Sequence, residues 1–201
     1  VQGGSGADDE VVPFDPGRFW EHTEAPTLKR PNFLPIVASN SLATMLSRKA
    51  TGRIDGFIVE GRTAGGHNAP PRGVKELNDR GEPVYGTRDE VNLGKIADIG
   101  LPFWIAGGAG SPERLKAAQD AGAAGIQVGT LFAYCEESGL AADLKEHVVC
   151  LSVEQEVDVL TDDRASPTGF PFKTVFLDGS LSEDEVYAER QRVCDLGYLR
   201  T

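Results

Sequence analysis

The sequence is poor in cysteine and in long apolar runs, and each shortage excludes a class of protein. Three cysteines among 201 residues, with no Cys-x-x-Cys pair, are too few and too widely spaced for a disulfide framework. A reducing compartment, the cytoplasm, is therefore the expected location. No apolar run approaches the roughly 18–20 residues of a membrane-spanning helix, so no membrane partner is expected.

Basic residues are also scarce. Lys and Arg number 20 against 31 Asp and Glu, which gives a net charge of -11 and leaves no basic cluster for a nucleic acid. His147 and Cys150 form a lone His-x-x-Cys pair, which cannot supply the four ligands of a structural zinc site, so no metal is expected. The sequence also lacks a Gly-x-Ser-x-Gly nucleophile elbow and a P-loop.

Four short apolar runs alternate with helical patterns in the middle of the chain. The runs are 34–38, 56–60, 102–106 and 124–128. Short strands without polar alternation, separated by helices, predict a parallel sheet covered by helices. This α/β pattern fits both a doubly wound sheet and a (β/α)8 barrel, and in either fold the chemistry lies beyond the carboxyl ends of the strands.

The helical patterns lie between and after these runs. They are predicted at 39–52, 89–100, 111–122, 140–148 and 182–196. The third has the clearest ends, because Ser111 suits the N-cap, Pro112 the first helical position and Gly122 a left-handed C-terminal cap. For the last, Ser182 and Glu185 predict a capping box.

A glycine turn with a histidine follows the second apolar run. Residues 60–67 read Glu-Gly-Arg-Thr-Ala-Gly-Gly-His. Gly65 and Gly66 allow conformations and close approaches that a side chain would block, and histidine transfers protons near neutral pH. The pattern fits a catalytic histidine and also an exposed histidine beside an ordinary turn.

Glycines also follow the last two apolar runs. Gly107 and Gly108 lead into one helix, and Gly129-Thr130 follows the other strand. Free backbone N–H groups at strand–helix junctions bind phosphate. Barrels often build a phosphate site from the loops after strands seven and eight, so the pattern favours a phosphate-bearing ligand and numbers the four visible strands five to eight.

The order of these motifs resembles that of the nitronate monooxygenases, formerly called 2-nitropropane dioxygenases. The resemblance covers about 34–172 and rests on residues 60–67, 104–108, 125–132 and 166–171. It implies an FMN-dependent TIM (β/α)8 barrel, of which this chain holds about the last four βα units and a C-terminal helical tail. The implied parts are an irregular lead-in segment at 1–33, the half barrel at 34–150 and an acidic tail with a helix at 151–201.

The resemblance also assigns site residues. His67 is the implied catalytic base, acting at the carbon that bears the nitro group. The implied FMN contacts, with Gly129 and Thr130 at the phosphate and Val128 acting through its backbone, are Glu60, Gly65, Gly107, Gly108, Gln127, Val128, Gly129 and Thr130. The implied partners are a small-molecule nitronate, or a similar acidic carbon compound, and molecular oxygen.

Two features depart from the family pattern. Many members have glutamine at the position of Glu60, and a carboxylate beside a flavin that becomes anionic is unfavourable unless it is protonated or turned away. The loop from His67 to about residue 86 is longer than usual in such barrels. Its length fits a lid in which Arg72 pairs with an anionic nitronate, and also a surface loop in which Arg72 is a solvated cation.

Other functions and the extent of the chain stay open. Flavin-dependent enoyl-acyl-carrier-protein reductases share the Ala-Gly-Gly-His turn, and a non-catalytic flavin-binding barrel also fits. The inosine-monophosphate dehydrogenase type needs a cysteine that residues 60–86 lack.

Val1 opens the chain and Met45 is its only methionine, so we expect the chain to start inside a barrel, with exposed sheet edges that make it aggregate or self-associate.

Overall fold

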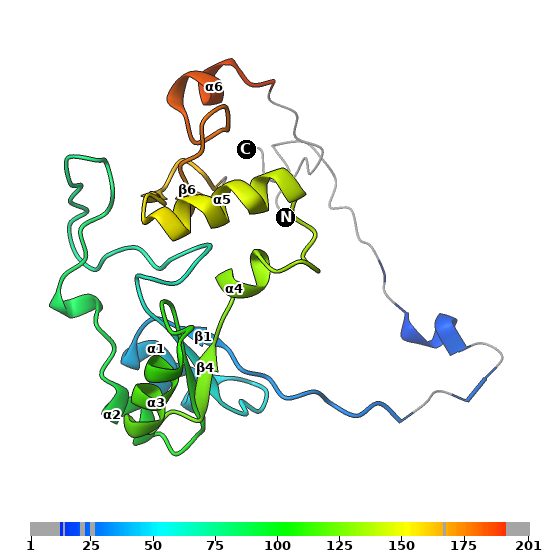
Figure 1. Cartoon of the computed structure of the whole chain (residues 1–201). Coiled ribbons are helices and arrows are strands. Elements are labelled where there is room, and N and C mark those ends of the chain that lie inside the picture. The colour runs from blue at the N-terminus through cyan, green and yellow to red at the C-terminus, as the bar shows by residue number, and fades with distance from the viewer. Residues whose placement is uncertain (1–12, 14, 21–22, 25–26, 167, 192–201) are drawn as a thin grey trace, which may run out of the picture. The chain divides into compact units, whose positions relative to one another are not determined.

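A computed structural model describes residues 13, 15–20, 23–24, 27–166 and 168–191 (Figure 1). The chain divides into two units, residues 1–31 and residues 32–201. In the first unit, the 3-10 helix η1 covers Pro16–Trp20, and the Asp15 carboxylate accepts a hydrogen bond of 2.9 Å from the Gly17 N–H. The predicted three-part division of the chain stays a prediction.

Four parallel strands form the main sheet of the second unit, in the order β1-β2-β3-β4. Their bounds are Ile36–Val37 for β1, Phe57–Glu60 for β2, Phe103–Ala106 for β3 and Gly125–Gln127 for β4. Each strand lies inside one of the four predicted apolar runs, and neighbours pair in parallel. The predicted parallel α/β class is confirmed, and the closed eight-stranded barrel stays a prediction.

Helices connect these strands as the helical patterns predicted. Helix α1 covers Asn40–Lys49 and α3 covers Pro112–Asp120. The Ser39 hydroxyl accepts from the Leu42 N–H at 3.1 Å, and the Ser111 hydroxyl caps α3 in the same way. Gly122 follows α3 with a φ of +87°, the left-handed cap that its position predicted.

The predicted helix over 89–100 is wrong in its bounds. The 3-10 helix η2 covers Thr87–Asp89, and α2 covers only Leu93–Ala97. Asn92 is the N-cap of α2, and its side chain accepts from the Lys95 N–H at 3.1 Å. Asp89 does not start the helix because its carboxylate already accepts hydrogen bonds from the Gly86 and Arg72 N–H groups, both at 2.8 Å.

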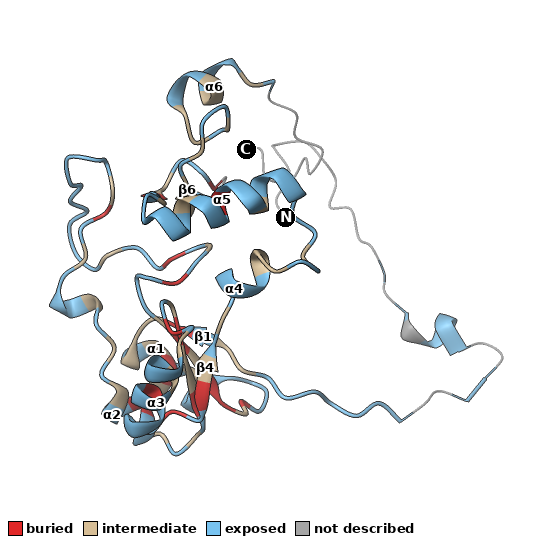
Figure 2. Ribbon diagram, in the orientation of Figure 1, coloured by how far each residue is buried: buried red, intermediate tan, exposed pale blue. Residues whose placement is uncertain are grey.

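The apolar core lies between the sheet and the helices. Figure 2 shows buried residues gathered in and around the strands near α1 and α3. Phe57, Phe103, Ile96 and Val37 are all less than 2% exposed. The buried cluster consists of Val37, Ala43, Ile54, Phe57, Val59, Ile96, Phe103, Ala118 and Ala123. Burial of this apolar area stabilises the sheet edge that carries the site.

The chain after β4 contains elements that the sequence did not predict. A short helix, α4, covers Thr130–Ala133, and α5 covers Ala142–Glu154, six residues beyond its predicted end. An antiparallel hairpin follows, with β5 at Val159–Asp162 and β6 at Phe172–Val175. We refer to residues 159–175 as the C-terminal hairpin.

The predicted capping box of the last helix is wrong. Helix α6 covers Asp184–Glu189 and its N-cap is Glu183. The Ser182 hydroxyl instead accepts from the Leu177 N–H at 3.0 Å and donates to the Leu177 carbonyl at 3.2 Å. Residues 192–196 of the predicted helix lie outside the described residues. Among the residues that are described, no helix has the length and apolar character needed to cross a membrane.

Gly56 gives a test of how tightly β2 packs. A Cβ atom there would lie 2.6 Å from Leu34 Cδ2 and 2.7 Å from the Pro102 carbonyl oxygen, which accepts a hydrogen bond from the Phe57 N–H. Gly56→Ala should therefore lower the free energy of unfolding by about 1–3 kcal/mol, measured by urea denaturation. At Gly52 a Cβ meets nothing within 4 Å, so Gly52→Ala is the control, and equal effects of the two substitutions would contradict the packing.

Candidate functional site

A cleft of about 750 Å³ opens at the carboxyl ends of β1, β2 and β3. Ser39, Glu60 and Gly107 line it from the ends of these three strands. Arg72 and Tyr85 line it from the long loop that follows β2. The cleft thus occupies the edge at which parallel α/β sheets bind their ligands.

Glycines bring the loops after β2, β3 and β4 together at this edge. Gly107 has a φ of +98°, and a Cβ on it would lie 2.7 Å from the Ala64 amide nitrogen. Gly108, with a φ of +63°, lies against Thr63. A Cβ on Gly65 would lie 3.9 Å from the Thr130 hydroxyl oxygen. The predicted ligand-contacting residues of three separate loops therefore adjoin one another.

The loop after β4 offers free donors at its exposed end. Gly129 is the N-cap of α4, no side chain caps this helix, and its first N–H groups have no intrahelical acceptor. A Cβ on Gly129 would meet nothing within 4 Å, and Gln127 and Thr130 are exposed. Val128 is half-buried and packs near Gly110. Open space beside backbone N–H groups and a hydroxyl suits a phosphate group.

Glu60 ends β2 as a half-buried carboxyl in the cleft. Burial raises the pKa of this carboxyl above its usual value, because desolvation disfavours the charged form. The shift favours the protonated state, which is the state that an anionic neighbour would require. Burial also raises the pKa of Tyr85, with the negative charges of Asp89 and Glu60 adding to the effect.

His67 lies next to the cleft and is held by the C-terminal hairpin. Its Nε2 is 2.6 Å from the Ser166 hydroxyl oxygen, and its ring meets the Phe172 ring edge-on, with centroids 4.8 Å apart. The backbone on either side of His67 is bonded as well. The Lys173 N–H donates to the Gly66 carbonyl at 2.9 Å, and the Asn68 N–H donates to the Pro171 carbonyl at 2.7 Å.

The sequence had not assigned roles to Ser166 or Phe172. The signal that could have found them was the Ser-Pro-Thr-Gly-Phe-Pro stretch at 166–171, which matched the family without a function attached. Among the described residues, Asn68 and Ala69 line the cleft and His67 does not. His67 therefore stands at the rim and is exposed.

Arg72 and Tyr85 fix the long loop against the strand ends. The Arg72 guanidinium donates to the Ala38 carbonyl at 3.0 Å, and its backbone N–H donates to Asp89. The Tyr85 hydroxyl donates to the Ala69 carbonyl at 3.0 Å. Arg72 therefore brings a cation to the cleft, as the lid interpretation requires, and its pairing with a substrate anion stays a prediction.

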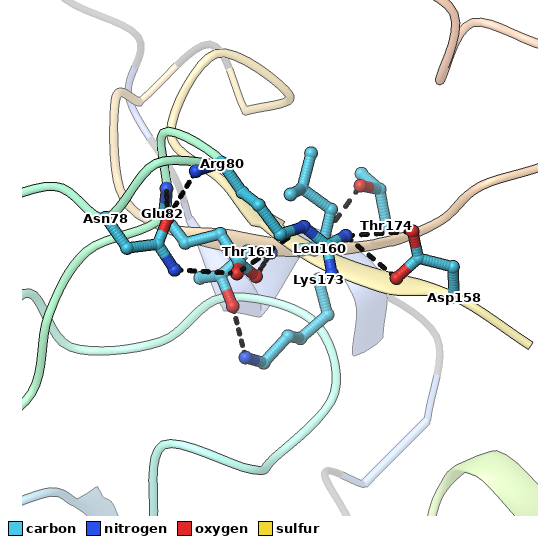
Figure 3. Close-up of polar contacts among 8 residues, drawn as sticks. All are labelled: Asn78, Arg80, Glu82, Asp158, Leu160, Thr161, Lys173 and Thr174. Carbon is cyan, nitrogen blue, oxygen red and sulfur yellow. Dashed lines mark hydrogen bonds and ion pairs between the residues drawn. The ribbon is translucent and has the colours of Figure 1, made fainter.

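The outer part of the same loop is bonded to the C-terminal hairpin (Figure 3). The Glu82 carboxylate accepts from the Thr161 N–H at 2.9 Å and from the Asn78 side-chain amide at 3.0 Å. Arg80 donates to both oxygens of Asp158 at 2.8 Å, and the Lys173 ammonium donates to the Thr161 hydroxyl. Loop and hairpin therefore form one polar assembly beside the cleft.

Comparison with known proteins identifies the family of this chain. Residues 21–164 match the nitronate monooxygenase family. The chain belongs to this family. A probable nitronate monooxygenase of Staphylococcus saprophyticus is 30% identical over 139 residues, which cover 69% of this chain and 38% of the relative. A nitronate monooxygenase of Pseudomonas aeruginosa is 33% identical over 122 residues, covering 61% of this chain and 33% of the relative.

Solved structures were compared as well. FabK from Thermotoga maritima superimposes with a TM-score of 0.49 and 28% sequence identity, over 72% of this chain and 39% of that one. This nitronate monooxygenase-family chain thus spans well under half the length of the relatives it matches.

Glu82 makes the attachment of the loop pH-dependent. Its pKa is lowered mainly by the hydrogen bonds from Asn78 and Thr161, with Arg80 and Lys173 adding positive charge. Because the folded-state pKa is below the unfolded one, the stabilisation is present above about pH 4.3 and is lost as the pH falls through the folded-state pKa. We expect Glu82→Gln to remove about 1 kcal/mol at pH 7 and less at acid pH.

The measurement is urea denaturation of wild type and variant at both pH values. Exposed Glu154 on α5 provides the control, because Glu154→Gln removes the same charge away from the loop. A Glu82→Gln penalty that does not shrink at acid pH would assign the effect to something other than the carboxylate charge.

Proposed function

We propose that this nitronate monooxygenase-family chain belongs to an FMN-dependent (β/α)8-barrel oxidoreductase that oxidises alkyl nitronates with molecular oxygen. The observation that carries the proposal is the meeting of three glycine loops and His67 at one sheet edge. Gly107 packs on the turn before His67, and Gly65 adjoins Thr130, which supports the proposal that the phosphate loop and the base act on one ligand. The chain covers 38% and 33% of the two relatives described above, so the activity of the whole protein is part of the proposal.

The residues present suit FMN. Gly129 and Thr130 would hold the phosphate with free N–H groups and a hydroxyl, and Gly108 would add to that end. The remaining contacts proposed for the flavin are Glu60, Gly65, Gly107, Gln127 and Val128. When bound, FMN supplies the electron transfer between the substrate and oxygen.

The chain itself supplies proton transfer and orientation. When a neutral nitroalkane binds, His67 takes the proton from the carbon that bears the nitro group and so forms the nitronate, and the cleft-lining Arg72 offers a cation to that anion. Phe172 meets the His67 ring edge-on and helps to fix its orientation. The burial that raises the pKa of Glu60 disfavours an opposing negative charge at the end of β2.

The cofactor test compares FMN with riboflavin, which has the same ring and no phosphate. The purified protein should bind FMN and show a flavin spectrum, and Thr130→Ala should weaken FMN binding about tenfold, the effect of about 1.4 kcal/mol, without changing riboflavin binding. Thr51→Ala, exposed and remote from the strand ends, is the control. A colourless protein that ignores added FMN would overturn the cofactor assignment.

Substitution of His67 tests the reaction. His67→Gln should lower turnover of nitroalkanes by about a hundredfold or more while FMN stays bound, because a general base contributes that much. His147→Gln on the exposed face of α5 is the control. Unchanged turnover would remove His67 from the mechanism.

The same assay separates the alternatives. Rapid reduction of the flavin by NADH or NADPH without any nitro compound would favour a reductase of the enoyl-acyl-carrier-protein type. Flavin binding with no reduction by any donor would favour a non-catalytic barrel.

A further inference from the structure

We propose that Ser166 is a positioning residue that holds His67 with its ring hydrogen on Nε2, which leaves Nδ1 as the nitrogen that takes the substrate proton. This inference rests on the base role proposed for His67. It adds a residue from the C-terminal hairpin, 99 positions away in the chain, to the chemistry of the strand-end loops.

The first support is the geometry of the contact. Ser166 is 5% exposed, and its hydroxyl oxygen lies 2.6 Å from His67 Nε2. That bond occupies Nε2, so this nitrogen cannot also face a substrate. Among the residues that the structure describes, Nδ1 has no hydrogen-bond partner. A base needs an unshared lone pair, and Nδ1 is therefore the nitrogen that can offer one.

The second support comes from the donors and acceptors around Ser166. The Ser166 oxygen accepts from the Thr168 N–H at 3.3 Å and lies 2.7 Å from the Thr168 hydroxyl oxygen. The Ser166 hydrogen can go either to Thr168 or to Nε2. In the proposed arrangement Ser166 donates it to Thr168, and its remaining lone pair accepts the hydrogen of Nε2. The Thr168 oxygen also accepts from the Phe170 N–H at 3.4 Å, so the chain of bonds ends on the hairpin backbone.

The third support is that the ring cannot turn freely. Phe172 meets the imidazole edge-on at an interplanar angle of 84°. The two backbone hydrogen bonds that flank His67, from Lys173 to Gly66 and from Asn68 to Pro171, hold its Cα against the hairpin. Ring orientation and hydrogen position are thus both set before substrate arrives, as efficient proton transfer requires.

The proton step balances with this assignment. The C–H bond beside the nitro group breaks, its electron pair stays on the substrate as the nitronate, and an N–H bond forms at Nδ1. The imidazolium produced keeps its Nε2 hydrogen bond to Ser166, so no bond around Ser166 has to rearrange during the transfer.

Nitrogen-15 NMR of the purified protein reads the ring hydrogen directly. The chain has three histidines, and loss of one signal in His67→Gln identifies the His67 resonances. We expect neutral His67 to carry its hydrogen on Nε2 in the wild type and to show a mixture of the two neutral forms in Ser166→Ala. A wild-type hydrogen on Nδ1, or an unchanged form in Ser166→Ala, would overturn the proposal.

Kinetics of the FMN-loaded protein separates positioning from a structural role. Ser166→Ala should lower kcat for a nitroalkane about tenfold to a hundredfold, with KM and FMN affinity unchanged, and Ser166→Thr should restore most of the rate. Ser180→Ala is the matched control, because Ser180 pairs with the Ser182 hydroxyl away from His67. Parallel losses of rate, FMN affinity and folding in Ser166→Ala, not restored by Ser166→Thr, would make Ser166 structural and refute the proposal.

A less disruptive substitution than Ser166→Ala tests the same hydrogen bonds in case that variant does not fold. Thr168 is exposed, and Thr168→Val removes the acceptor of the Ser166 hydrogen together with the weak bond from the Phe170 N–H, so we expect a partial change in the NMR form of His67 and a smaller loss of kcat. No change in either would contradict the hydrogen-bond chain. The NMR result does not depend on activity, so a wild type that lacks turnover would refute the proposed function and leave the assignment of the ring hydrogen to be decided separately.

Discussion

The site depends on a close approach of two backbones. Where the chain leaves β3, Gly107 lies so near the Ala64 amide that no side chain fits between the two loops. This contact draws the turn at 61–66 over the sheet edge and directs His67 toward the C-terminal hairpin. The buried strands form a rigid support for the loops. The glycines in these loops allow the backbone conformations that the close packing requires.

Local physics made much of the fold predictable. The four strands coincide with continuous apolar runs, and Ser39, Ser111 and Gly122 act as the caps that their residue types favour. The failures have physical causes too. Asp89 resembles a helix start but bonds to a loop, and α5 continues to Gln155, where a φ of 63° ends it.

The candidate site was predictable only in part, because its bonds join distant segments. The glycine loops can be found in the sequence because each follows an apolar run, and the structure brings Gly65, Gly107 and Thr130 together. The hydrogen-bond partners of His67 and Glu82 cannot be found in this way, because Ser166 is 99 residues from His67 and Thr161 is 79 residues from Glu82. The resemblance implied an acidic tail after residue 150, but not that two of its carboxylates, Asp158 and Asp163, would pair with Arg80 and Lys75 of the loop.

The C-terminal hairpin is made last among the elements of the site. During synthesis the glycine loops and His67 emerge first, and the segment that orients the imidazole follows about a hundred residues later. Domains generally fold as units, so the strand-end loops and the hairpin are expected to reach their final arrangement together. The contacts that hold His67 therefore cannot form until residues 166–173 have been synthesised.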